Sequence, residues 1–213
     1  MKVLLIDDHA LFRDALGLLI SHRFPSMDLV ACGRLADALE RVAQDPAIRL
    51  ALLDLGLPDS QGLASLAQLR EAAPDLTVVV LSGDDRPETI LDVIEAGAAG
   101  FIPKTAQASV LAEALRVVID GGVWLPEGAL AGADAARAPV APNPLADLSP
   151  RQIDVLRLLI RGQSNKLICR ELGLSESTVK THLAAIFRRL GVHNRTQAVL
   201  AAARLGLRLP APH

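Results

Sequence analysis

The chain has 213 residues, about half of them apolar, and this composition is typical of packed globular domains rather than of disorder. Its formal net charge of −2 hides a division: residues 1–147 hold 11 Lys and Arg against 21 Asp and Glu, and residues 148–213 hold 11 against 3. No apolar run approaches the roughly 18 residues of a membrane span, and the apolar run after Lys2 is too short for a signal peptide. We therefore expect a soluble, cytoplasmic protein in which an acidic module is joined to one that binds a polyanion.

The first 120 residues alternate short apolar runs with longer amphipathic segments. The aliphatic runs predict strands buried on both faces, at residues 3–6, 29–32, 50–53, 77–81 and 100–102. Segments with helical spacing lie between and after them, at residues 10–22, 35–43, 63–72, 87–96 and 106–119. Strict alternation of this kind predicts a parallel sheet with right-handed crossovers and helices on both faces.

Residues 121–147 interrupt this alternation. They are dense in Ala, Gly and Pro and have little periodicity, which predicts a linker that is flexible at first and semi-rigid in its Pro-rich second half. The two cysteines, Cys32 and Cys169, lie far apart in apolar stretches. We expect both to be packed as free thiols, as befits a reducing cytoplasm, rather than joined in a disulfide or a metal site.

Helical signals fill the remainder of the chain. The segment SPRQ at residues 149–152 has the form of a capping box with Pro at the first helical position, and it begins a helix that Gly162 ends. A second helix is predicted over residues 164–172, before Gly173. A third begins after the cap residue Ser175 and runs to residue 190, and a fourth runs from Asn194 to Gly206.

Charged and hydroxyl side chains stand at the carboxyl ends of four predicted strands. Asp7 and Asp8 follow the first strand, Asp54 follows the third, Ser82 ends the fourth and Lys104 follows the fifth. In an open parallel sheet these ends form one edge, where ligands bind. Three carboxylates there repel one another, and a hard cation such as Mg²⁺ relieves that repulsion. One carboxylate can then accept a phosphoryl group, whose oxygens the Lys and Ser side chains can bind.

These residues carry a resemblance. The acidic pair in LLIDDH, the Asp in LLDLGLPDSQG, the hydroxyl in VVLSG and the Lys in AGAAGFIPK make residues 1–120 similar to the receiver domain of bacterial two-component response regulators. The resemblance implies a doubly wound, flavodoxin-like α/β sheet of five parallel strands in the order 2-1-3-4-5. It also implies that Asp54 is the phosphoacceptor.

The same resemblance assigns roles around Asp54. Asp8 would bind Mg²⁺ directly and Asp7 mainly through water, with Asp54 and the backbone carbonyl of Gly56 as further ligands. Ser82 and Lys104 would sense the phosphoryl group, and Phe101 would be the switch aromatic, at a position where many receivers have Tyr. Ordinary core packing is the alternative explanation for Phe101.

The third helix of the basic module, in SESTVKTHLAAIFRRL, has two distinct faces. Its apolar residues recur at helical spacing and predict a core face formed by Val179, Leu183, Ile186, Phe187 and Leu190. The opposite face is small and polar with basic residues, so it can enter a DNA major groove without clashing. With the preceding helix and the turn at Gly173, this pattern indicates a helix-turn-helix.

The segment LSPRQIDVLRLLIRGQSNKLICRELGLSESTVKTHLAAIFRRLGVHNRTQAV resembles the LuxR/FixJ-type DNA-binding domain, a small all-α unit of four helices. The resemblance implies an assignment of residues 148–213 to this domain. It implies DNA contacts at Asn165, Lys166, Ser175, Thr178, Val179, Lys180, Thr181, Ala184 and Arg188. It further implies that the last helix pairs two copies of the chain through Arg195, Ala198, Val199 and Ala202.

We therefore expect a response regulator transcription factor of the NarL/FixJ type, and not an enzyme beyond self-phosphorylation and self-dephosphorylation. Its expected partners are a sensor histidine kinase, promoter DNA and, once phosphorylated, a second copy of the chain. The acidic receiver can dock on its own basic module when unphosphorylated. One alternative is a phosphorylation-independent DNA-binding regulator with a vestigial receiver. Another, an Asp-nucleophile phosphatase, normally needs a carboxylate two residues after the nucleophile, where this chain has Gly56.

Overall fold

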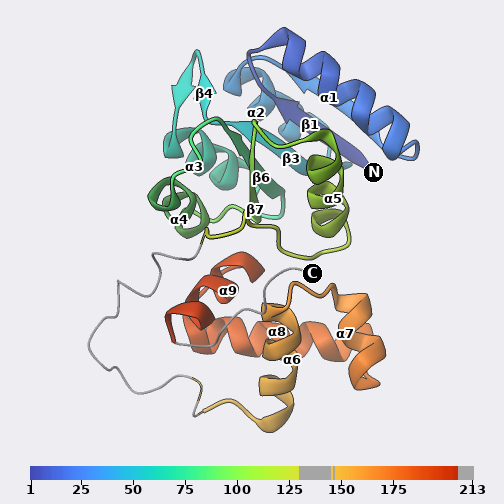
Figure 1. Cartoon of the computed structure of the whole chain (residues 1–213), viewed down its shortest axis with the longest axis vertical. Helices are drawn as coiled ribbons and strands as arrows, with labels where there is room; N and C mark the ends of the chain where they lie inside the picture. The colour runs from blue at the N-terminus through green and yellow to red at the C-terminus, as the bar shows by residue number, and fades with distance from the viewer. Residues whose placement is uncertain (130–144, 146, 206–213) are drawn as a thin grey trace.

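The computed structural model describes residues 1–129, 145 and 147–205, which form an α/β unit and an all-α unit (Figure 1). The α/β unit is built on five strands in the order β2-β1-β3-β6-β7, and every neighbouring pair is parallel. The strands are β1 (Lys2–Ile6), β2 (Asp28–Cys32), β3 (Ile48–Asp54), β6 (Thr77–Ser82) and β7 (Gly100–Pro103). The predicted strand order is therefore confirmed.

Helices cover both faces of this sheet because the buried strands carry aliphatic residues on both sides. Leu4 and Ile6 of β1 pack in the core with α2 (Leu35–Gln44), α3 (Leu63–Ala72) and α4 (Pro87–Glu95). Val3 and Leu5 pack on the opposite face, in the core with α1 (Ala10–Arg23) and α5 (Ala108–Ile119).

A short hairpin that the sequence did not predict follows β3. It pairs β4 (Gly56–Leu57) with β5 (Ser60–Gln61), and two-residue strands are too short for an alternation signal. Between them, the Asp59 carboxylate accepts hydrogen bonds from the backbone N–H groups of Leu35 (2.9 Å) and Ala36 (3.0 Å), at the start of α2. These bonds hold the pKa of Asp59 below its ordinary value.

The described beginning of the predicted linker packs against the α/β unit. Trp124 forms a bridge with Gly100, and its carbonyl accepts a hydrogen bond from Phe101 N at 3.2 Å. Ala129 is buried in the core on the α4 side. This segment therefore continues the α/β unit, and the Pro-rich second half of the predicted linker lies outside the described residues.

Four helices form the C-terminal unit: α6 (Pro150–Ile160), α7 (Asn165–Leu172), α8 (Glu176–Leu190) and α9 (Arg195–Arg204). The predicted capping box is confirmed, because Ser149 Oγ accepts from Gln152 N (3.3 Å) and Gln152 Oε1 accepts from Ser149 N (2.9 Å). Gly173 ends α7 in the left-handed region at φ 65°. The predicted stop at Gly206 lies outside the described residues. Within the described part of the chain, no helix has the length and apolar character needed to cross a membrane.

The two units touch along one side of α9. In Figure 1, α9 is the helix of the C-terminal unit that lies beside α4 and β7. Leu200 is buried in the core of the α/β unit, although it belongs to α9. Gly122 lies at the junction as well: a Cβ there would stand 2.7 Å from Val117 Cγ1 and 2.9 Å from the carbonyl oxygen of Gly162.

Candidate functional site

The carboxyl ends of β1 and β3 bring the three predicted carboxylates together. Asp7 and Asp54 are buried and Asp8 is exposed. One ligand atom from each of them, together with one from His9, forms a group whose members all lie within 4.8 Å of one another. The structure thus brings Asp54 to the same rim as the adjacent pair Asp7 and Asp8, as the strand-end argument predicted.

Lys104 is the cation that faces these acids. Its Nζ lies 2.7 Å from Asp7 Oδ2 and 2.8 Å from Asp54 Oδ2, and the side chain is only 17% exposed. Burial by itself would lower the pKa of Lys104, but the contacts with Asp54 and Asp7 outweigh it and raise the pKa above its ordinary value. The ring of Phe12 lies 5.0 Å from Nζ and adds a cation–π contact.

The rim has the chemistry of a site for a hard divalent cation. Asp7 Oδ2 and Asp54 Oδ2 lie on buried side chains, and the ammonium of Lys104 contacts both oxygens. Three carboxylates against one Lys leave an excess of negative charge. Carboxylate oxygens are the ligands that Mg²⁺ prefers, so these residues fit that ion.

Ser82, Gly56 and Phe101 surround the rim. Ser82 Oγ accepts a hydrogen bond from Asp84 N at 3.1 Å, and Ser82 O accepts one from Lys104 N at 2.8 Å. A Cβ at Gly56 would lie 3.7 Å from Asp54 Oδ2, so the backbone of Gly56 borders the Asp54 carboxylate. Phe101 is fully buried on β7, in the core that α4 also lines.

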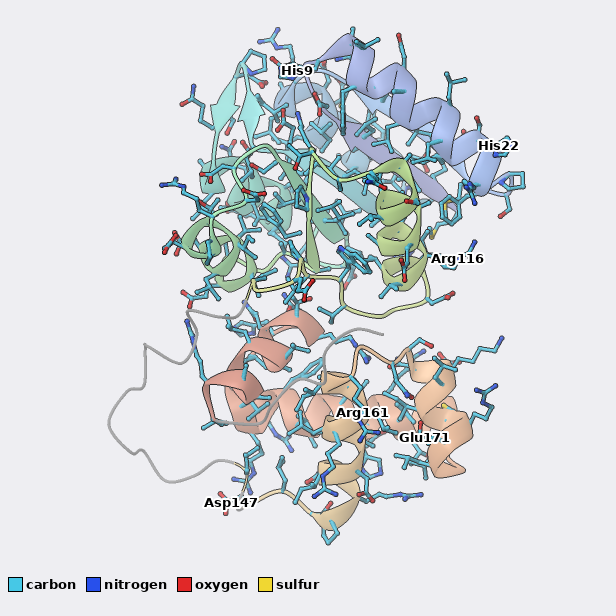
Figure 2. All side chains as sticks on the ribbon, viewed as in Figure 1. His9, His22, Arg116, Asp147, Arg161 and Glu171 are labelled. Atoms are coloured by element: carbon cyan, nitrogen blue, oxygen red, sulfur yellow. The ribbon has the colours of Figure 1, made fainter. Side chains whose placement is uncertain are left out.

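Two residues of the rim were not predicted. His9 Nδ1 lies 2.7 Å from Asp8 Oδ1 and 3.2 Å from Asp7 Oδ1, and Arg13 Nη1 donates to the carbonyl oxygen of Asp7 at 2.6 Å. Only their positions in the sequence could have indicated them: His9 directly follows the acidic pair, and Arg13 lies one turn into the helix. In Figure 2, His9 lies at the end of the α/β unit remote from the C-terminal helices, where Arg161 and Glu171 are labelled.

The outward face of α8 is a candidate surface for DNA. Lys180, Thr181, Ala184 and Arg188 are all exposed. Lys180 Nζ lies 2.7 Å from Glu176 Oε1 one turn earlier, and this pair raises the pKa of Lys180 and lowers that of Glu176. The hydroxyl of Thr181 donates to the backbone carbonyl of Ser177 at 3.0 Å.

The other predicted DNA contacts occupy different surroundings. Ser175 caps α8, accepting from Thr178 N at 3.1 Å; Ser175 is exposed and Thr178 is half-buried. Asn165 and Lys166 are the first residues of α7. Val179 does not reach the surface: it is fully buried in the core of the C-terminal unit, as its place in the apolar stripe requires. The expectation that Val179 contacts DNA is corrected on that ground.

The predicted dimer contacts on α9 also need correction. Ala198, Val199 and Ala202 are 0%, 3% and 0% exposed and lie in the core that α6 and α8 share. Their small size serves close packing within the unit, so they offer no free surface to a second chain. Arg195 points into the same unit and donates from Nη1 to Asn165 Oδ1 at 3.2 Å.

The opposite side of α9 meets the α/β unit through polar contacts that sequence reasoning missed. Three side chains of its cap and first turn donate to backbone carbonyls between α4 and β7: Asn194 to Gly97, Thr196 to Ala99 and Gln197 to Glu95. At the other end of the helix, Arg204 forms an ion pair with Glu95.

A parallel five-stranded sheet with this acidic rim, joined to a four-helix unit with an exposed basic helix, defines a receiver coupled to a helix-turn-helix. Comparison with known families agrees: residues 3–116 match the response regulator receiver domain, and residues 146–202 match the bacterial regulatory proteins of the luxR family. The chain therefore belongs to the two-component response regulators of the NarL/FixJ family, which are DNA-binding transcription regulators.

Relatives and solved structures extend over nearly the whole chain. The chain is 37% identical to the glycerol metabolism activator of Pseudomonas putida, with 94% of each chain covered. It is 35% identical to the transcriptional activator DevR/DosR of Mycobacterium tuberculosis, with 96% of this chain and 95% of the relative covered. A structure of RcsB from Salmonella enterica serovar Typhimurium has a TM-score of 0.58, covers 96% of this chain and 98% of its own, and at 20% identity supports the fold alone.

Proposed function

We propose that a sensor histidine kinase phosphorylates Asp54 and that this modification controls dimerisation and DNA binding by the C-terminal unit. The observation that carries the proposal is the contact of Lys104 Nζ with the buried carboxylates of Asp54 (2.8 Å) and Asp7 (2.7 Å) at a rim that fits a divalent cation. The chemistry needs a carboxylate that accepts the phosphoryl group, a cation site and a positive charge that binds the phosphoryl oxygens, and this rim has a candidate for each.

In the transfer, a carboxylate oxygen of Asp54 forms a bond to phosphorus, and the bond from phosphorus to the nitrogen of the donor histidine breaks. Lys104 is already close enough to exchange one carboxylate oxygen for a phosphoryl oxygen, and the Ser82 hydroxyl can donate to another. Asp7, Asp8, Asp54 and the carbonyl of Gly56 would hold Mg²⁺, which neutralises charge on the phosphoryl group when bound. Phe101 would relay the change to the α4 side of the core.

The arrangement of the two units supports an inhibited form before phosphorylation. Residues 1–147 carry a net charge of −10 and residues 148–213 one of +8, which favours their association. The contacts on α9 hold one face of that helix against the receiver, and release would expose Thr196, Leu200 and Arg204. We propose this face for pairing of two chains, in place of the buried alanines.

DNA recognition in this proposal belongs to the exposed face of α8. Lys180, Thr181 and Ala184 would reach base edges, and Arg188 would contact the phosphate backbone with Asn165, Lys166, Ser175 and Thr178. The free thiols of Cys32 and Cys169 suit the cytoplasm, where we place the protein together with its kinase and DNA partners.

The test is to incubate the full chain with Mg²⁺ and acetyl phosphate, then measure protein mass and DNA affinity. Wild-type protein is expected to gain one phosphoryl group and to bind DNA more tightly, and Asp54→Asn to do neither. Asp75→Asn, which removes an exposed carboxylate from the loop before β6, is the matched control and should behave as wild type. Wild-type protein that gains no phosphoryl group would favour the vestigial receiver, and unchanged affinity after phosphorylation would favour DNA binding that is independent of phosphorylation.

A further inference from the structure

The cap and first turn of α9 are anchored to the receiver through its backbone. The donor–acceptor distances are 3.0 Å from Asn194 Nδ2 to Gly97 O, 2.6 Å from Thr196 Oγ1 to Ala99 O, and 2.9 Å from Gln197 Nε2 to Glu95 O. Glu95 is the last residue of α4, so Gln197 satisfies a carbonyl that the helix leaves free, whereas Gly97 and Ala99 lie beyond the end of the helix. Because the acceptors are carbonyls, the contact depends on the position of the segment 95–99 rather than on its side chains.

Segment 95–99 leads directly into β7, and the phosphorylation rim lies at the other end of that strand. Lys104 follows β7, reaches Asp54 with Nζ at 2.8 Å, and ties its own N–H to Ser82 O at 2.8 Å. Figure 1 shows α9 near the end of the strand where β7 begins. One four-residue strand thus joins the group that senses Asp54 to the carbonyls that hold α9.

Arg195 lies between two of these anchors in sequence but points the opposite way, into the C-terminal unit. Its Nη1 donates to Asn165 Oδ1 at 3.2 Å, and its Nη2 donates to the carbonyl of Gln163. Burial lowers the pKa of Arg195 to about 10, and no carboxylate of the described residues lies within ion-pair distance of it. The buried guanidinium is therefore held by two uncharged oxygens, those of Asn165 and Gln163, and it moves with α9.

Asn165 is the residue that this guanidinium orients. It is the first residue of α7, directly after the cap Ser164. Because its Oδ1 accepts from Arg195, the amide group keeps its Nδ2 hydrogens for an outside acceptor. In the proposed function, that acceptor is a DNA phosphate.

We infer that the first turn of α9 couples the receiver to the DNA-facing end of α7, with Arg195 as the positioning residue for Asn165. A displacement of segment 95–99 on phosphorylation loosens these anchors, and Arg195, which moves with the first turn of α9, carries the change to the Asn165 amide. This inference rests on the proposed function, because it assumes that phosphorylation changes DNA affinity. It differs from a route through α8, whose reading face is already exposed in this form.

The test is a double-mutant cycle in the full chain, with affinity for a random-sequence DNA duplex measured by fluorescence anisotropy. Arg195→Ala and Asn165→Ala are each expected to weaken binding about fivefold to tenfold, the loss of one hydrogen bond to a charged group. The double variant should bind no more weakly than either single variant, because both remove the same contact. Arg161→Ala, which removes an exposed charge at the end of α6, should have a smaller effect.

Two further variants keep the test decisive. Arg195→Lys replaces the guanidinium with an ammonium that reaches only one of the two oxygens, so it should lose less DNA affinity than Arg195→Ala. If Arg195→Ala does not fold, Arg195→Lys takes its place in the cycle. Thr196→Val removes the bond to Ala99. It should reduce the change in affinity that acetyl phosphate produces, and this reduction should vanish in the Asn165→Ala background.

The outcomes separate the two proposals. Additive losses from Arg195→Ala and Asn165→Ala, or a response to acetyl phosphate that Thr196→Val leaves intact, would overturn the positioning role. A wild-type protein whose DNA affinity does not respond to acetyl phosphate would overturn the proposed function itself. Equal thermal midpoints among the variants confirm that affinity, and not folding, has changed.

Discussion

The ammonium of Lys104 lies 2.8 Å from Oδ2 of Asp54, so the candidate phosphoacceptor is already engaged by the cation that would later bind its phosphoryl group. The same ammonium lies 2.7 Å from Asp7 Oδ2, so one Lys side chain contacts both buried carboxylates. Phosphorylation would therefore rearrange an existing contact rather than create a new one. Because Lys104 follows β7, any such rearrangement acts directly on that strand.

Replacing Lys104 with Met is expected to destabilise the receiver by about 1–3 kcal/mol, since it leaves two buried carboxylates without their cation, and partial exposure reduces the effect below that of a fully buried pair. Urea unfolding at neutral pH measures the change, with Lys104→Arg as the charge-preserving control. An unchanged unfolding midpoint for Lys104→Met would show that the carboxylates do not depend on this contact.

The raised pKa of Lys104 also predicts how stability depends on pH. A group whose pKa is higher in the folded state stabilises fully below its ordinary pKa, about 10.4 for Lys, and this contribution is lost as pH rises through the folded value. Wild-type protein should therefore lose more stability than Lys104→Met in the alkaline range above that pH. The absence of tyrosine removes one competing alkaline titration from the measurement.

The two adjacent acids are expected to differ in their effect on phosphorylation. Asp8→Ala should abolish Mg²⁺-dependent phosphorylation, because the proposal makes Asp8 a direct ligand, and Asp7→Ala should only weaken it. Asp7 also accepts from His9 N at 2.9 Å and faces Lys104, so Asp7→Ala should lower thermal stability as well. Mass spectrometry after incubation with acetyl phosphate over a range of Mg²⁺ concentrations measures both effects, and equal phosphorylation of the two variants would contradict the assignment.

Leu200→Ser should loosen the contact between the two units. Leu200 is 2% exposed against the receiver core, and burial of a Leu side chain contributes about 1.5–3 kcal/mol, so the open form should become at least about tenfold more populated. Limited proteolysis of the segment between the units should then proceed faster without phosphorylation, as we also expect for phosphorylated wild-type protein. Leu200→Met conserves volume and serves as the control. Identical cleavage rates would indicate that this contact does not restrain the chain.

Lys180→Ala should weaken binding to a specific DNA site about tenfold to a hundredfold if the side chain touches a base. Glu176→Gln should act in the opposite direction, because it removes the carboxylate that lies 2.7 Å from Lys180 and would repel DNA phosphates. Binding measured in parallel on specific and random duplexes separates the roles. Equal losses on both for Lys180→Ala would make it a phosphate contact.

The sequence predicted the receiver fold and its rim well because both depend on local signals. Buried strands such as β3 and β6 are aliphatic runs, and the carboxyl ends of parallel strands must meet at one edge, which is why Asp7 and Asp54 could be placed together. The cap residues Ser149 and Asn194 were likewise identifiable from side chains that bond to the next turn.

The sequence could not predict which element packs against each face of a helix. The family resemblance implies that Ala198 and Ala202 pair with a second chain, but these residues belong to the core of their own unit, because small residues also allow helices of one unit to pack closely. The anchors of Thr196 and Gln197 have backbone acceptors, which carry no sequence signal at all. The hairpin around Asp59 was missed because its strands are shorter than any detectable period.

Gly122 sets a limit on side-chain size where the two units meet. A single added methyl group there would stand 2.7 Å from Val117 Cγ1 and 2.9 Å from the carbonyl of Gly162, closer than real Cβ atoms are found. Because Val117 belongs to the α/β unit and Gly162 to the C-terminal unit, a side chain at this position would press on both units at once. The close approach of the two units therefore requires a residue without a side chain here, and larger residues would favour their separation.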